Sequence, residues 1–181
     1  MANSPIKLIW GKEGHDFVHI DDISGPIYSI LECGGEPYGT AWPTPSGTLI
    51  SSEGRKNYKR GDFLIGLWGG ALVFRKSVLS AMGPMLRANG EVLPLDLGKD
   101  GTVYILNTKH CDCLLNGGYQ DREHIRDIQR EWRTFDMSKC AGRDIFVVPE
   151  ETTYTYVSDA FIEAVKENRL TGVRFSVTHE L

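Results

Sequence analysis

The run from His110 to Cys113, His-Cys-Asp-Cys, holds the residues of this chain that are best suited to chemistry. Thiolates and imidazoles bind zinc, and a structural zinc site usually takes two pairs of them, with two to four residues between the partners of a pair. Here the two cysteines are one residue apart, no second pair follows, and Cys140 stands alone. On a strand, His110 would also point away from both thiols, because alternate side chains lie on opposite faces. We therefore expect no metal site.

A cysteine–histidine nucleophile is the second chemistry to consider. The chain has four cysteines and five histidines, and no local signature singles out one pair among the many combinations. The pairs Asp21-Asp22 and Glu150-Glu151 would point to opposite faces of a strand, and no glycine-rich run has a phosphate-binding pattern. We expect the cysteines to be reduced and packed as small hydrophobic residues, with no catalytic residue and no cofactor.

Aromatic residues in loop-like stretches are better candidates for function, because aromatic and arginine side chains anchor protein interfaces. Some of them should instead cover the edges of the core. The aromatic residues are Trp10, Tyr38, Trp42, Tyr58, Trp68 and Tyr119. A mixed-charge face adds Arg122, Glu123, Arg126 and Arg130. From these two sets we take Trp42, Tyr58, Trp68, Tyr119 and the four charged residues as the candidate partner-binding residues.

Composition limits the classes of partner. The chain has 181 residues, 41% of them hydrophobic, and a formal net charge of −4, which argues against nonspecific binding to nucleic acid. The basic run at Arg55, Lys56, Lys59 and Arg60 is typical of a solvated loop. No stretch approaches the roughly 18 apolar residues of a membrane helix, and the N-terminal apolar cluster is too short for a signal peptide. We expect a cytoplasmic protein with no membrane or nucleic-acid partner.

The length suits one domain, spanning residues 1–181, with two unequal parts. Residues 1–61 are rich in glycine, proline and serine, and we expect only brief strands there, at Ile6–Trp10, Phe17–Ile20 and Ile27–Leu31. From residue 62 to 176 the pattern is that of a regular core. It starts with apolar runs at Phe63–Leu67 and Ala71–Phe74.

A helix is predicted over Lys76–Ala88, where apolar residues recur at spacings of three and four. Pro84 should either kink it or divide it into two short helices. Asn89-Gly90 is a natural stop, since glycine takes the left-handed cap conformation at little cost.

A β-hairpin is predicted next, with Glu91–Leu97 and Thr102–Asn107 flanking the turn Gly98–Gly101. Lys109–Leu115 should continue as a strand, with Cys111, Cys113 and Leu115 on one face. The segment Asp121–Met137 fits a helical stripe, but Trp132–Met137 could equally be a strand. We predict a helix first and a strand after it.

The clearest unit runs from Gly142 to Phe175. Strands are predicted at Ile145–Val148 and Thr153–Val157, then a helix with Ser158 as its N-cap and a buried stripe of Phe161, Ile162 and Val165. A last strand contains Val173 and Phe175. The predicted fold class is α+β, a single domain with a mixed or antiparallel sheet, a few helices and a loop-rich N-terminal part.

Four motifs together resemble a known family. They are GDFLIGLWGGALVFRKSVLSAM, then EVLPLDL-GKDG-TVYILN, then HCDCL, and GRDIFVVPEETTYTYVSDAFIEAVKENRLTGVRF, and they cover about residues 62–175. In order and content they are similar to a bacterial immunity-protein family that was formerly catalogued as a domain of unknown function and is found beside polymorphic toxin genes. Most of the motif positions specify packing, and none supplies a catalytic residue.

The resemblance implies a small non-catalytic protein that binds and neutralises a cognate toxin by covering its active or docking surface. A mildly acidic chain favours a basic toxin as the partner. The alternatives are a regulatory or scaffold module with a non-toxin partner and, more remotely, a cysteine-dependent hydrolase. The sequence leaves the partner and the oligomeric state open.

Overall fold

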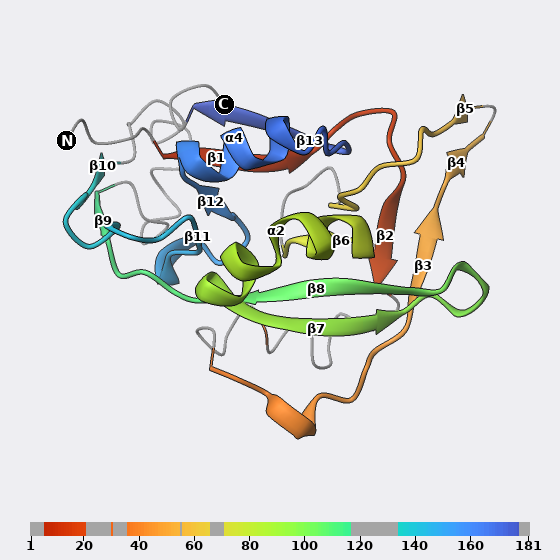
Figure 1. The fold of residues 1–181 in the computed structure, drawn as a ribbon, viewed down its shortest axis with the longest axis horizontal. Helices are drawn as coiled ribbons and strands as arrows, with labels where there is room; N and C mark the ends of the chain where they lie inside the picture. The colour runs from red at the N-terminus through yellow and green to blue at the C-terminus, as the bar shows by residue number, and fades with distance from the viewer. Residues whose placement is uncertain are drawn as a thin grey trace, which may run out of the picture.

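The computed structural model describes residues 6–20, 30, 36–54, 56–65, 71–116 and 134–177. Over these residues the chain has the predicted α+β fold, with antiparallel sheets and the helices α2 and α4 (Figure 1). None of the helices in the described ranges is long and apolar enough to cross a membrane.

A four-stranded antiparallel sheet joins the two ends of the described chain. Its order is β11 (Ile145–Phe146), β12 (Tyr156–Val157), β1 (Lys7–Gly11) and β13 (Val173–Val177). The early strand β1 therefore lies between two late strands. Ile9 pairs with Phe175, and the indole Nε1 of Trp10 donates to Ser176 Oγ at 2.9 Å. The predicted strand at Ile6–Trp10 is confirmed, and Trp10 is buried in it rather than exposed in a loop.

Alternate residues of this sheet are buried on opposite faces, as the two-residue period of a strand requires. One face packs into a cluster that we name the helix-side core: Ile9, Phe63, Ile65, Leu72, Phe74, Val78, Met82, Leu86, Leu106, Ile145, Val157, Phe161, Ile162 and Val165. The other face packs into the thiol-side core: Ile6, Leu8, Trp10, Cys111, Cys113, Cys140, Phe146, Val148 and Tyr156. The sheet is therefore buried on both sides.

A three-stranded antiparallel sheet carries the predicted hairpin. Its order is β6 (Val73–Phe74), β8 (Thr102–Thr108) and β7 (Gly90–Asp96), and the turn contains the short 3-10 helix η2 (Gly98–Asp100). Gly98 has a φ of 57° and Gly101 a φ of 84°, conformations that other residues rarely adopt. The hairpin prediction is confirmed.

Helix α2 (Lys76–Asn89) lies across the hairpin and runs through Pro84 as one helix (Figure 1). Pro84 is exposed, so water can reach the carbonyl that its ring deprives of a donor. The helix ends where predicted, but the predicted left-handed glycine cap is wrong. Gly90 has a φ of 175°, which is extended rather than left-handed, and it begins β7. Glycine is needed there because a Cβ would collide with the carbonyl oxygen of Asn107.

The predicted helix is confirmed as α4 (Asp159–Glu167), which packs on the four-stranded sheet. Its N-cap is Ser158, whose Oγ accepts from the amide of Phe161 at 3.2 Å. Phe161, Ile162 and Val165 are buried in the helix-side core. Gly172, with a φ of 96°, then turns the chain into β13. Before the helix, the predicted strands are shorter than expected, because the 3-10 helix η4 (Pro149–Glu151) separates β11 from β12.

The N-terminal part adds two small antiparallel sheets, β2 (Phe17–Ile20) with β3 (Gly47–Ile50) and β4 (Ser52–Glu53) with β5 (Lys56–Asn57). The predicted strand at Phe17–Ile20 is confirmed, whereas Ile27–Leu31 lies outside the described residues except for the buried Ile30. An ion pair ties this part to the core, since Arg75 Nη2 lies 2.6 Å from the buried Asp16 Oδ2.

The strand predicted over Lys109–Leu115 is wrong for most of its length. Only β9 (Leu114–Asn116) is extended there, and it pairs with β10 (Thr134–Phe135). The amide of Cys113 donates to the carbonyl of Cys111 at 2.9 Å, a tight local turn that interrupts the strand alternation. Leu115 is 64% exposed and does not share the buried side of the cysteines. The predicted helix over residues 121–133 lies outside the described residues, and a strand does follow it at β10.

Candidate functional site

A groove of about 580 Å³ lies between the end of α2 and the hairpin β7–β8. We call it the hairpin groove. Its lining combines apolar and charged side chains: Pro37, Leu79, Arg87, Gly90, Glu91, Val92, Tyr104 and Lys109. A mixed lining of this kind is typical of sites that bind another molecule through a few placed polar groups.

The floor of the hairpin groove is apolar and firmly supported. The ring of Tyr104 stacks on that of Phe74, with centroids 6.2 Å apart and planes inclined by 26°. Leu79 and Val92 are half-buried against the helix-side core. Because the floor belongs to the packed core, its shape is set before any partner arrives.

The rim of the hairpin groove carries unequal charges. Arg87 is exposed in the last turn of α2 and makes no ion pair within the described part of the chain. Lys109 is held in place, since its Nζ donates to the carbonyl of Ala88 at 3.0 Å. The carboxylate of Glu91 is already used, because it accepts from the amides of Tyr38 at 2.7 Å and Gly39 at 2.9 Å. The charge left to meet a partner is therefore positive.

The segment Glu36–Trp42, which we call the strap, borders the hairpin groove through Pro37 and includes the 3-10 helix η1 (Gly39–Ala41). Its end is anchored by Trp42, whose indole Nε1 donates to the carbonyl of Pro94 at 2.7 Å. The ring of Trp42 meets that of Tyr38 edge to face at 5.0 Å. Trp42 is half-buried. Its contacts hold the strap against β7, beside the groove rather than in it.

Tyr58 is the other sequence candidate within the described residues, and it lies away from this site. Tyr58 is half-buried, and its ring lies 6.2 Å from that of Phe17 in the N-terminal part. Six candidates lie outside the described residues: Trp68, Tyr119, Arg122, Glu123, Arg126 and Arg130. Of the basic run, Lys56, Lys59 and Arg60 are exposed, as expected of a solvated loop.

Sequence reasoning missed the groove residues because they come from separate elements. Arg87 reads as the basic last turn of a helix, and Glu91 as the first residue of a strand. Tyr104 looks like any aromatic residue of a hairpin. The available signal was Lys109, a cation directly after the strand that closes the hairpin, but its position beside α2 is a product of tertiary packing.

The second candidate site is the thiol cluster, which we define as Cys111, Cys113 and Cys140. Their sulfur atoms all lie within 4.8 Å of one another, and the three side chains are 3%, 1% and 6% exposed. Cys140 therefore does not stand alone, as its sequence position suggested. His110 is not part of this group, and the strand on which its predicted orientation rested does not form there.

Electrostatics of the thiol cluster do not suit a nucleophile. Burial raises the pKa of Cys113, and hydrogen bonds with the neighbouring thiols of Cys140 and Cys111 raise it further. Burial also raises the pKa of Cys140. A cysteine nucleophile needs the opposite shift, toward the thiolate at neutral pH. Burial lowers the pKa of His110, which leaves a neutral ring beside the cluster.

Comparison with known proteins adds no relative: no protein-family model matches the chain, and no curated protein matches it either.

Proposed function

We propose that this chain is a non-catalytic immunity protein that binds a cognate protein toxin and neutralises it by covering the active or docking surface of that toxin. The hairpin groove is the observation that carries the proposal within the structure. The resemblance of residues 62–175 to an immunity-protein family supplies the kind of partner. The proposed setting is the cytoplasm of a bacterium that makes the toxin itself.

The hairpin groove suits a protruding segment of a partner protein. Its apolar floor at Leu79, Val92 and Tyr104 would receive an aliphatic or aromatic side chain. The cations Arg87 and Lys109 on its rim would meet a carboxylate of the same segment. Arginine and tyrosine are among the residue types enriched at the positions that dominate binding energy in protein interfaces.

Long-range and local charge act differently in this proposal. The formal net charge of −4 favours encounter with a basic toxin, since complementary fields raise association rates. The positive rim of the groove then selects an acidic segment on that toxin. A partner with a basic surface and one protruding acidic loop satisfies both conditions.

The test begins with the protein encoded beside this one in its genome. Co-expression of the two should restore growth that the neighbour alone stops, and the two should purify as a complex. Protection without a complex, or a complex without protection, would contradict neutralisation by binding; the latter result would favour a regulatory or scaffold role.

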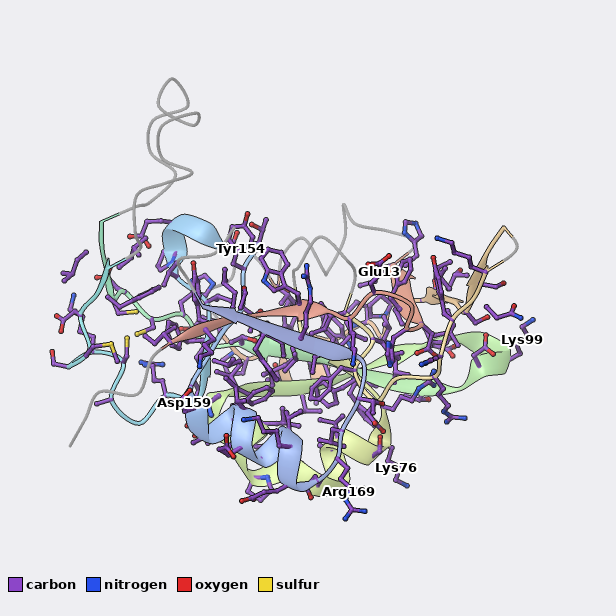
Figure 2. All side chains as sticks on the ribbon, turned by 90° about the horizontal axis from the view of Figure 1, so that it is seen from above. Glu13, Lys76, Lys99, Tyr154, Asp159 and Arg169 are labelled. Atoms are coloured by element: carbon purple, nitrogen blue, oxygen red, sulfur yellow. The ribbon has the colours of Figure 1, made fainter. Side chains whose placement is uncertain are left out.

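The site is tested with a matched pair of charge reversals. Arg87→Glu should weaken the complex at least about tenfold, equivalent to about 1.4 kcal/mol. Lys99→Glu makes the same charge change at the tip of the hairpin β7–β8, away from the groove (Figure 2). It should leave the affinity within about twofold. Equal effects of the two variants, measured by calorimetry, would show that only overall charge matters and would exclude the hairpin groove as the contact.

A further inference from the structure

The thiol cluster brings together two segments that are distant in sequence. Cys111 and Cys113 follow β8, and Cys140 lies in the turn after β10. A backbone hydrogen bond joins the segments directly, since the amide of Asp136 donates to the carbonyl of Cys113 at 2.7 Å. Figure 2 shows yellow sulfur atoms gathered toward one end of the molecule, away from the hairpin tip at Lys99. All three cysteines within the described ranges meet at this point.

The spacing of the sulfur atoms is close to that of a metal site. Zinc–thiolate bonds of about 2.3 Å place tetrahedral sulfur ligands about 3.8 Å apart. The three sulfur atoms lie within 4.8 Å of one another, so side-chain rotations that move each of them by less than about 1 Å would close the site. We propose that Cys111, Cys113 and Cys140 bind one zinc ion as thiolates, with a water molecule or another donor in the fourth position.

Backbone turns on both segments already hold the thiols in place. The amide of Cys113 bonds to the carbonyl of Cys111 at 2.9 Å, which allows two cysteines one residue apart to face one point. On the other segment, the amide of Arg143 donates to the carbonyl of Cys140 at 3.0 Å, and Gly142 supplies the φ of 75° that this turn requires. A ligand set held by turns loses little freedom when the metal binds.

The ligand chemistry selects a soft ion. Thiolates prefer zinc and copper(I) over magnesium or calcium, which take oxygen ligands. The nearest carboxylate in the same turn, Asp136, is occupied by Ser138, which donates from its amide at 3.0 Å and its hydroxyl at 2.6 Å. Asp136 therefore braces the turn and leaves the ligand positions to sulfur.

Proton and charge balance define what binding must do. Each thiol loses its proton to water as a zinc–sulfur bond replaces a zinc–water bond, so one ion releases about three protons. The Cys111 thiol now donates to the carbonyl of Lys139 at 3.5 Å, and this contact is given up. Three thiolates and Zn²⁺ carry a net charge of −1. Lys139 and Arg143 lie on the same turn, and the ammonium of Lys139 faces the carboxylate of Asp112 at 3.9 Å.

The test uses the full chain purified under reducing conditions, with zinc as the probe. Native mass spectrometry should find about one zinc per chain after addition of the metal and dialysis. Titration in weak buffer should release about three protons per zinc. The melting temperature should rise by roughly 5–10 °C at a hundredfold excess over the Kd, and fall again with a chelator. Cobalt(II) should give the near-ultraviolet absorption of thiolate-to-metal charge transfer.

Variants separate the ligands from the packing around them. Cys113→Ser and Cys140→Ser keep the shape of the side chain but remove a soft donor. Loss of a residue that only supports a ligand costs roughly 10–100-fold in metal affinity, so each of these variants should weaken zinc binding by more than that. Val148→Ala removes buried volume from the same core and no ligand, and should keep one zinc per chain.

Three results would overturn the proposal. The first is that the wild-type protein takes up no zinc and releases no protons, a result that does not depend on the folding of any variant. Another is zinc binding that persists in both serine variants, since the ion would then lie elsewhere. The third is a site that binds copper(I) but not zinc. The inference does not depend on the proposed immunity function, because no partner protein takes part in these measurements.

Discussion

The two faces of the four-stranded sheet are closed in different ways. On the helix-side core, α4 and α2 cover Ile9, Ile145 and Val157 with aliphatic and aromatic side chains. On the thiol-side core, the covering segments that the structure describes are loops and the two-stranded sheet β9–β10, and three thiols lie among the hydrophobic residues. Within the described residues, the same strands thus serve one core built from regular elements and another built mainly from turns.

The difference teaches where each core derives its stability. A capped helix satisfies its own backbone and needs only an apolar face to dock. Turns satisfy fewer of their own hydrogen bonds, so the loops of the thiol-side core depend on links such as that between Asp136 and Cys113. A metal bound by both loops would add a further link between them.

Truncation on the helix-side core should have the largest effect. Phe161 is fully buried and its ring contacts those of Phe63 and Phe175. Phe161→Ala should lower the free energy of unfolding by about 3–5 kcal/mol, because the lost burial and the remaining cavity add. Urea unfolding should give the same loss with and without zinc. A loss that depends on zinc would mean that the two cores are not independent.

Neighbouring residues of β1 offer a sharper comparison. Leu8 and Ile9 are both buried but point to opposite cores, and each change to alanine should cost about 2–5 kcal/mol. Combined with Cys140→Ser, Leu8→Ala should be non-additive by about 0.5–3 kcal/mol, because both sites lie in one packed cluster. Ile9→Ala with Cys140→Ser should add within about 0.5 kcal/mol.

The measurement is a double-mutant cycle on unfolding free energies, made with zinc removed. Additivity in both pairs would show that the thiols do not pack as part of a core. Coupling in both would show that the sheet transmits strain from one face to the other, and the distinction between the faces would fail.

Loss of the α4 cap should have a moderate effect. Ser158 Oγ accepts from the amide of Phe161 and donates to Asp144 Oδ1 at 2.7 Å. Ser158→Ala should cost about 0.5–2 kcal/mol of unfolding free energy, and Ser158→Thr should retain most of the capping bond. If zinc uptake also fell in Ser158→Ala, the cap would be serving both faces, in contrast to the separation described above.

The smallest effect concerns pH. Burial alone would raise the pKa of Asp62, but hydrogen bonds from Ser77 and Thr171, together with the charge of Arg75, outweigh it and leave the pKa below 3.8. The folded state therefore binds this proton less readily than the unfolded state, and the stabilisation is present above about pH 3.8 and lost as pH falls through the folded value. Asp62→Asn should reduce stability near neutral pH, and its difference from wild type should shrink in acid. A difference that grew in acid would reverse the sign of the shift.

Local patterns predicted the helix-side elements well. The stripe Phe161, Ile162 and Val165, the cap at Ser158 and the hairpin turn at Gly98–Gly101 follow from periodicity, capping chemistry and glycine conformation. These are short-range effects, so the residues that cause each structure lie close together in the sequence. The extended Gly90 was missed because its reason is the approach of Asn107 from another strand.

The candidate sites were much harder to predict. The thiol cluster needs Cys113 and Cys140 to meet across 27 residues of chain, and the turn at Cys111 breaks the alternation on which the sequence argument rested. The hairpin groove depends on where α2 crosses β7, which periodicity does not specify. Trp42 was selected because it lies in a loop-like stretch, yet it serves to anchor the strap.

The central position of β1 also determines when the protein can fold during synthesis. Trp10 can bond to Ser176 only after that residue, 166 positions further along the chain, has been synthesised. At about 5–20 residues per second, a ribosome needs roughly 8–33 s to make that distance. Until then β1 is an apolar strand with two open edges, the feature that allows a strand to pair with another chain.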